Sequence, residues 1–291
     1  MKKKLVFIMS IIFLLICISV TFSIEERKNE IINSKFDEKL LEKISNESKE
    51  EIRVIIKFSQ KPSLSLESKI KSSANIIYEY KFFKGIAIKA NKEVLKDLVW
   101  SKEIEKIYSD EKVSLPKPIK VMQSEYSSYV DNRSNYINVQ PVWDQKITGF
   151  NVTIAIIDTG IDPTHPDFLF PVGKIRGWKD FINGRPDPYD DHGHGTHCAS
   201  LAAGTGTQSN GKFKGVAPDA FLLIAKVLDA EGSGYSSDII AGIDWAIQNG
   251  ADVISLSLGG SYSGPMSPLT EAVNNAVDQG IFVAVAAGNN G

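Results

Sequence analysis

The stretch NVTIAIIDTG, residues 151–160, begins an alternation of apolar strands and helices that occupies the second half of the sequence. Its apolar run is typical of a strand that is buried on both faces of a parallel sheet. Further strands are predicted over residues 220–229, 251–260 and 281–291, with helices over residues 194–204, 235–250 and 267–280. This alternation predicts an α/β fold, a doubly wound parallel sheet with helices on both faces.

The carboxyl ends of the predicted strands bring functional candidates together. In a doubly wound sheet these ends meet at one edge, where ligands and catalytic groups collect. Asp158 ends the first strand, and His194 begins the helix that follows. A carboxylate in this position can fix the tautomer of a histidine base and stabilise the imidazolium that forms. The two residues therefore predict an acid–base pair.

The segment DDHGHGTHCAS, residues 190–200, contains three of the four histidines of the sequence, His192, His194 and His197. Such crowding indicates either a metal site or a general base, because histidine ligates metals and titrates near neutral pH. His192 precedes the predicted helix, no HExxH motif occurs, and no complete zinc set is present. The sequence therefore favours the general base.

Residues 51–115 follow a different pattern, in the order β-α-β-β-α-β, which predicts a small α+β ferredoxin-like domain. Its strands are predicted over residues 51–58, 74–83, 85–90 and 104–113, and its helices over residues 64–72 and 91–100. Residues 24–50 are densely charged and fit either a short amphipathic helix or a tether. Residues 116–138 contain two prolines and several serines, and they predict a linker.

Residues 1–23 combine three lysines with a long apolar run and end in small residues, which predicts a cleaved export signal. The alternative is an uncleaved membrane anchor, since Leu5–Phe22 reaches the lower limit of a spanning helix. We thus expect a secreted, extracellular protein with no membrane contact after signal cleavage. Two cysteines, Cys17 and Cys198, exclude a disulfide framework, and a net charge of −2 gives no electrostatic reason to expect a nucleic-acid partner.

Four short motifs follow one another in the second half of the sequence: Asp158–Gly160, His194–His197, Ser257–Gly260 and Ala287–Asn289. In this order and rough spacing, over residues 139–291, the sequence resembles the subtilisin-like serine proteases. Residues 51–113 look like the inhibitory propeptide of that family. The resemblance implies that Asp158 orients the base, and that His194 is the general base and then the general acid. It also implies that Asn289 donates its side-chain amide to the oxyanion, and that the chemistry needs no cofactor.

The resemblance further implies that an extended peptide binds as a strand between two strand ends, through main-chain hydrogen bonds. The residues at these ends are Gly232, Ser233, Gly234, Ser257, Leu258 and Gly259. The partners expected are protein or peptide substrates. Residues 51–115 are expected to serve as an intramolecular inhibitor and folding aid, until the chain is cleaved within residues 116–138.

Three more residues take their expected roles from the resemblance. Cys198 would be a buried thiol beneath His194 and not a nucleophile, and His197 would be structural. Asp167 matches a position that binds calcium in many relatives, so a structural calcium ion is expected there. The neighbouring loop, residues 204–215, differs in length from the usual calcium loop of the family.

A serine nucleophile is not evident, because no Gly-Thr-Ser or Gly-x-Ser-x-Gly motif occurs in residues 1–291. We expect the sequence to be a fragment of the precursor of a serine endopeptidase, inactive as given, whose serine lies beyond Gly291. An alternative is an inactive pseudoprotease that binds peptides. Another is a nucleotide-binding α/β protein, which is disfavoured because no G-x-G-x-x-G motif follows the first strand.

Overall fold

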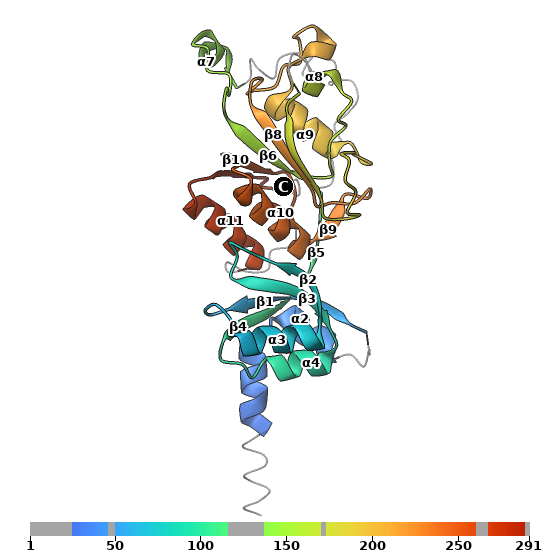
Figure 1. Cartoon of the computed structure of the whole chain (residues 1–291), viewed down its shortest axis with the longest axis vertical. Helices are drawn as coiled ribbons and strands as arrows, with labels where there is room; N and C mark the ends of the chain where they lie inside the picture. The colour runs from blue at the N-terminus through green and yellow to red at the C-terminus, as the bar shows by residue number, and fades with distance from the viewer. Residues whose placement is uncertain (1–24, 46–49, 116–136, 170–172, 260–266, 289–291) are drawn as a thin grey trace, which may run out of the picture. The chain divides into compact units, whose positions relative to one another are not determined.

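The structure, a computed structural model, describes residues 25–45, 50–115, 137–169, 173–259 and 267–288. This part of the chain divides into two compact units, whose elements are labelled in Figure 1. The first contains the residues up to Glu79 and Lys84–Ser109, and the second contains Tyr80–Phe83 and the residues from Asp110 onward. The predicted export signal, residues 1–23, and most of the predicted linker lie outside the described residues.

The first unit contains an antiparallel four-stranded sheet in the spatial order β2-β3-β1-β4. Its elements are α2 (Glu38–Ser45), β1 (Ile52–Phe58), α3 (Leu64–Ser73), β2 (Asn75–Glu79), β3 (Gly85–Ala90), α4 (Lys92–Leu98) and β4 (Ile104–Ser109). From β1 onward the elements have the predicted β-α-β-β-α-β order.

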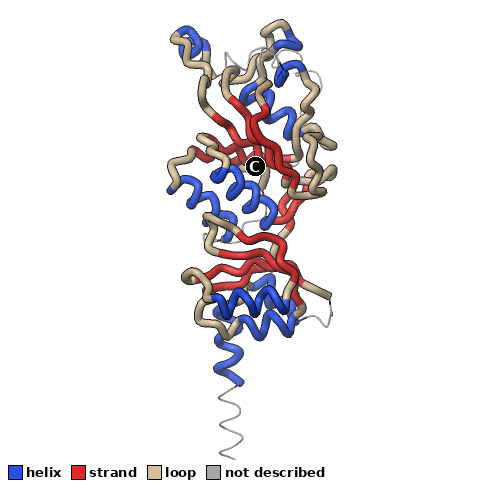
Figure 2. The backbone as a smooth tube through the Cα atoms, in the orientation of Figure 1, coloured by secondary structure: helices blue, strands red, loops and turns tan. Residues whose placement is uncertain are grey.

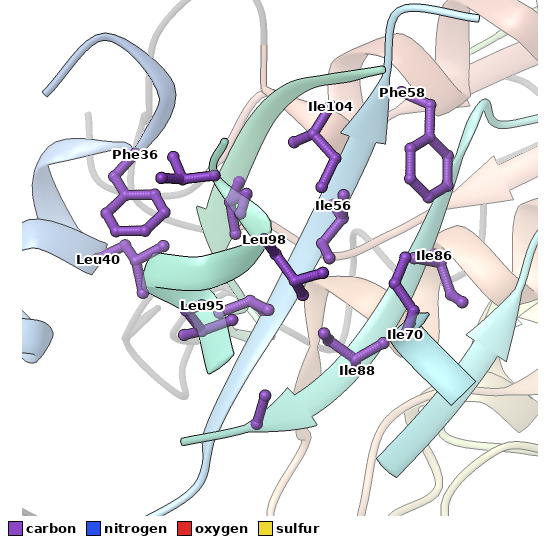
Figure 3. Close-up of a cluster of buried hydrophobic side chains, with 14 of the residues drawn as sticks. Phe36, Leu40, Ile56, Phe58, Ile70, Ile86, Ile88, Leu95, Leu98 and Ile104 are labelled. Atoms are coloured by element: carbon purple, nitrogen blue, oxygen red, sulfur yellow. The ribbon is translucent and has the colours of Figure 1, made fainter. Parts of the chain in front are cut away.

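A hydrophobic core lies between this sheet and its helices (Figure 3). Alternate residues of a strand point to the same face, so residues such as Ile56 of β1 and Ile88 of β3 both enter the core. Phe36 and Leu40, from the N-terminal charged region, are buried in the same core. The described part of this region is therefore helical and packs on the unit.

The strand predicted over residues 74–83 ends at Glu79. Beyond that point the main-chain N–H groups of Lys81 and Phe82 donate to the carboxylate of Asp244, at distances of 2.6–3.1 Å. The predicted strand was too long because these N–H groups donate hydrogen bonds to a side chain far away in the sequence instead of to a neighbouring strand.

The strand predicted over residues 104–113 is in fact two strands. β4 ends at Ser109, and the following residue, Asp110, accepts hydrogen bonds from the N–H and the hydroxyl of Ser237. A second short strand, β5 (Lys112–Ser114), then pairs within the second unit. The buried carboxylate of Asp110 therefore interrupts what the sequence pattern indicated as one strand.

The second unit is built on a five-stranded parallel sheet in the order β11-β10-β6-β8-β7. Figure 2 shows the strands of this unit in red and its helices in blue. Besides β5, its elements are α7 (Gln140–Asp144), β6 (Thr153–Asp158), α8 (Pro166–Leu169), β7 (Ile175–Asp180), α9 (His194–Ala203), the 3-10 turn η2 (Thr207–Ser209), β8 (Phe221–Lys226), β9 (Ser233–Tyr235), α10 (Ser236–Gln248), β10 (Val253–Leu256), α11 (Pro268–Asp278) and β11 (Phe282–Val285). β7 was not predicted, because this edge strand mixes charged residues with apolar ones and has no apolar run.

Helices cover both faces of the parallel sheet, which confirms the predicted fold class. On one face Ala199 of α9 lies in a buried cluster with Ile156 of β6 and Ile224 of β8. On the other face Gly242 of α10 lies against Ile157. Ile156 and Ile157 mark the two faces because successive strand residues point in opposite directions. Within the part of the chain that the structure describes, no helix has the length and apolar character needed to cross a membrane.

Candidate active site

Asp158 is the last residue of β6, the middle strand of the sheet, and its carboxylate is buried. Its Oδ1 accepts hydrogen bonds from Nδ1 of His194 at 2.8 Å and from the N–H of Thr159 at 2.7 Å. Oδ2 is also buried and has no hydrogen-bond partner among the described residues. A carboxylate facing Nδ1 holds the proton on that nitrogen, and this leaves Nε2 as the atom that exchanges protons with a reactant.

His194 is the first residue of α9, and a second carboxylate fixes this end of the helix. Asp190 accepts hydrogen bonds from the N–H groups of Gly193 and Thr196, at 2.8 and 2.9 Å, and from the Thr196 hydroxyl at 2.6 Å. It also accepts from the Thr159 hydroxyl at 2.9 Å, which ties the end of β6 to the start of α9. Burial opposes ionisation of Asp190, but these hydrogen bonds outweigh it and hold the pKa of this carboxyl below its usual value.

Two glycines allow the strand end and the helix to approach each other. A Cβ atom on Gly195 would overlap the carbonyl oxygen of Gly160. Gly160 itself has a φ of 123°, a conformation that residues with a side chain rarely adopt. The glycines that follow Asp158 and His194 in the two motifs are therefore what permits these two side chains to meet.

The hydrogen bond to Asp158 stabilises the charged form of His194. Together with the neighbouring Cys198 sulfur, which contributes less, it raises the pKa of His194 to about 10 against the opposing effect of burial. The raised pKa favours the imidazolium form of His194 at neutral pH. Only a neutral imidazole accepts a proton, so the fraction of His194 that can act as a base increases with pH.

Cys198 lies one helical turn after His194 and is half-buried. Its Sγ is 3.7 Å from Nδ1 and 3.9 Å from Nε2 of the imidazole. These two distances place the sulfur beside the imidazole ring of His194. Asp158, His194 and Cys198 are the group of three potential metal ligands found among the described residues, but the Asp158–His194 hydrogen bond already occupies their facing atoms. His192 and His197 are exposed and do not join this group.

Residues 112–115 lie along one of the two strand ends predicted to bind substrate. β5 pairs antiparallel with β9, so that Val113 is opposite Gly234 and Ser114 is opposite Ser233. The N–H of Leu115 then donates to the carbonyl of Gly232 at 2.9 Å. This side of the site thus holds an extended chain segment through its main chain.

The second predicted strand end contacts the same segment from the other side. The N–H of Ser114 donates to the carbonyl of Gly259 at 3.2 Å, and the N–H of Gly259 donates to the carbonyl of Ser114 at 3.3 Å. Ser257 and Leu258 connect Gly259 to the end of β10. Residues 112–115 are therefore held between β9 on one side and an antiparallel bridge to Gly259 on the other.

Asp167, in α8, is buried and is held by the 204–215 loop. Its Oδ1 accepts the N–H of Gln208 at 2.8 Å, and its carbonyl accepts the N–H and the hydroxyl of Thr205 at 3.2 and 3.1 Å. A calcium ion requires several oxygen acceptors directed at one point. Here the loop directs hydrogen-bond donors at Asp167, so these residues do not fit a calcium ion.

Asn289, predicted to donate to the oxyanion, lies outside the described residues. The sequence pattern did not single out two polar residues of the site. These are Lys226, which is buried, and Asp190, which is part-buried. Two features of the sequence could have indicated these residues. Asp190 and Asp191 form an acidic pair shortly before the HGTH motif, and Lys226 is the lysine of a predicted strand that is otherwise mostly apolar.

Comparison with known families divides the chain into two regions. Residues 149–291 match the subtilase family, and residues 33–116 match the peptidase inhibitor I9 family. The second match begins before β1 and includes the segment of Phe36 and α2.

Several bacterial proteases are similar to the chain. Serine protease AprX of Bacillus subtilis (strain 168) is 46% identical over 158 residues, which cover 50% of this chain and 35% of AprX. Subtilisin E of the same strain is 34% identical over 253 residues, covering 85% of this chain and 61% of Subtilisin E. The chain thus spans less than two thirds of the length of these relatives.

A solved structure with a similar fold is that of fervidolysin from Fervidobacterium pennivorans, a keratinolytic enzyme related to subtilisin. It superposes with a TM-score of 0.60 and 21% sequence identity, over 88% of this chain and 42% of fervidolysin. At this identity the likeness concerns the fold.

Proposed function

We propose, from the match of residues 149–291 to the subtilase family and of residues 33–116 to the peptidase inhibitor I9 family, that the chain is the precursor of a secreted serine endopeptidase. The observation that carries this proposal is the 2.8 Å hydrogen bond between His194 and the buried Asp158. It supplies the oriented base of a serine protease. Export would depend on residues 1–23 as a cleaved signal.

In the proposed reaction a serine hydroxyl attacks the carbonyl carbon of a peptide bond. Nε2 of His194 takes the hydroxyl proton and later delivers it to the departing amine, while Asp158 keeps the imidazole in the required tautomer. The serine would lie outside residues 1–291, since these contain no Gly-Thr-Ser motif. Asn289 would donate its amide to the oxyanion, and no cofactor takes part.

Substrates would bind in the way that residues 112–115 lie in the structure. Both flanking segments contact this segment through main-chain N–H and carbonyl groups. Every residue except proline offers the same groups, so broad selectivity among protein and peptide substrates is expected. The I9 region would inhibit the protease intramolecularly, because residues 112–115 occupy these strands until the chain is cleaved within residues 116–138.

A fluorophosphonate probe, which labels activated serines, tests the proposal. We expect no labelling of the 291-residue chain. We expect labelling and peptide hydrolysis from a version in which the serine-bearing segment of Subtilisin E is joined after Gly291. The matched control, His194→Gln in the extended chain, should lose both.

Two outcomes would contradict the proposal. Stoichiometric, His194-dependent labelling of the 291-residue chain would show that the nucleophile lies within it. An extended chain that is folded, binds peptide and is never labelled would favour a peptide-binding pseudoprotease.

A further inference from the structure

Lys226 ends β8 and is fully buried, directly opposite Asp158 in the neighbouring strand. Its ammonium donates to the carbonyl of Thr159 at 2.7 Å, to the carbonyl of Leu228 at 2.8 Å and to Oδ1 of Asp191 at 2.6 Å. An ammonium has three N–H donors, so each of them has an acceptor. Lysine is almost never fully buried unless it is paired, and Asp191 provides the pairing charge.

The three acceptors belong to three different segments of the site. Thr159 directly follows Asp158, and Asp191 lies three residues before His194. Leu228 lies on the segment that leads from β8 to β9, which holds residues 112–115. The side chain of Lys226 thus joins the end of β6 that carries Asp158, the loop that precedes His194, and the segment that leads to β9.

The ion pair matters differently to its two members, because Asp191 can be solvated by water without Lys226. Its side chain is 35% exposed, whereas that of Lys226 is 0% exposed. An exposed carboxylate is hydrated without a partner, so what the ion pair fixes is the loop that carries Asp191. That loop continues through Gly193 into the first residue of α9, which is His194.

We propose that Lys226 is a positioning residue that holds His194 against Asp158 through Asp191 and the Thr159 carbonyl. This assignment rests on the proposed function, because it gives Lys226 a part in the same acid–base pair. Its consequence is specific: loss of the ammonium should loosen the Asp158–His194 hydrogen bond, beyond any general loss of stability.

The test uses the complete 291-residue chain with Lys226→Met, which replaces the side chain by an unbranched one that is one atom shorter and uncharged. The control is Lys174→Met, because Lys174 is also buried in the second unit and donates to the carbonyl of Pro218 at 2.5 Å. Thermal unfolding measures stability. NMR of histidine-labelled chains measures the hydrogen-bonded Nδ1 proton of His194 and its titration, with Asp158→Asn identifying the signal.

We expect both methionine variants to unfold at lower temperature, but only Lys226→Met to lose the Nδ1 proton signal. In that variant the pKa of His194 should fall from about 10 toward its ordinary value of 6.5. A folded Lys226→Met chain that keeps both the signal and the titration overturns the proposal.

Asp191→Ala, which removes both acceptor oxygens, decides the matter if Lys226→Met does not fold. It should lose the same proton signal, and retention of the signal overturns the proposal. Where both variants fold, the double variant should lose no more of the signal than Lys226→Met alone, because the two residues act through one link. None of these measurements requires hydrolysis, so an extended chain that never cleaves peptides would refute the proposed function and leave this test intact.

Discussion

The carboxylate of Asp158 is buried, and it must nevertheless stay ionised to hold His194. Burial of a carboxylate is costly unless hydrogen bonds or a counter-charge compensate for it. The N–H of Thr159 and Nδ1 of His194 both bond to Oδ1, and the imidazolium supplies the charge. The site is therefore most stable when His194 is charged, whereas proton transfer from a nucleophile requires His194 to be neutral.

The pH dependence of stability follows from this conflict. The pKa of His194 is raised in the folded chain to about 10 from 6.5. The folded state thus binds more protons than the unfolded state between these values, and the free energy of unfolding should fall as pH rises through this window. The contribution is complete below pH 6.5. In Asp158→Asn the decline should be much smaller, as measured by urea unfolding from pH 5.5 to 10.

The matched controls are His194→Gln, which should remove the same decline, and His165→Gln, which should not. An undiminished decline in Asp158→Asn would mean that another group causes it.

Cys198 gives a second prediction at this scale. Because its sulfur lies beside the His194 ring, a bulky mercurial on Cys198 should displace the imidazole and inactivate the extended enzyme. Cys198→Ala should stay active and resist the mercurial. It should also need less alkaline pH for full activity, since the sulfur helps to raise the pKa of His194. Loss of all activity in a folded Cys198→Ala enzyme would indicate a catalytic thiol.

At the scale of elements, β5 is only three residues long, yet main-chain hydrogen bonds flank it on both sides. A short strand gains little from its side chains, so its binding depends on these bonds. A single substitution at Ser114 can remove the bond from its N–H to Gly259 without changing the charge of the segment.

The prediction compares two substitutions at Ser114 in a separately made polypeptide of residues 33–115, used as an inhibitor of the extended protease. Ser114→Pro removes the N–H and should raise the inhibition constant about three- to tenfold, as expected for one lost hydrogen bond. Ser114→Ala keeps the N–H and should inhibit like the parent. A titration against a chromogenic peptide measures both, and equal inhibition by the two variants would refute main-chain recognition by β5.

Local sequence patterns predicted the elements whose structure is determined locally. The apolar run of β6 and the small residues of α9 were sufficient to predict these two elements. Their order in the chain was sufficient to predict that Asp158 and His194 meet at the edge of the sheet. The patterns failed at residues 80–83, where the acceptor of the Lys81 N–H is 163 residues further along the chain. They also gave no sign that the lysine in β8 joins three segments, because periodicity does not show where a buried ammonium finds its acceptors.

At the scale of the whole molecule, the two units are not two consecutive pieces of chain. The chain leaves the first unit after Glu79, contributes four residues to the second, returns at Lys84 and leaves again after Ser109. The second unit holds its loop of residues 204–215 by hydrogen bonds from Gln208 and Thr205 to Asp167 of α8. Its stability should therefore not require a metal ion.

Calcium removal tests this expectation. Addition of a chelator should leave the unfolding temperature of the 291-residue chain unchanged. Asp167→Asn should also change it little, because an amide oxygen still accepts the N–H of Gln208. Asp167→Ala leaves that N–H without its acceptor and should cost about 1–3 kcal/mol, or several degrees. A chelator effect that disappears in Asp167→Asn would instead demonstrate a calcium ion bound at Asp167.

The contact of Asp244 with Lys81 and Phe82 uses a side chain on one side and only main-chain N–H groups on the other. Nineteen of the twenty amino acids carry that N–H, so positions 81 and 82 can drift in sequence without loss of the contact, and proline alone is barred. Position 244 has no such freedom, because few residues offer two acceptor oxygens at that reach. Among close relatives, substitutions should therefore accumulate at positions 81 and 82 of the loop, whereas position 244 of the helix should stay unchanged. Changes on the loop should not be accompanied by changes at position 244.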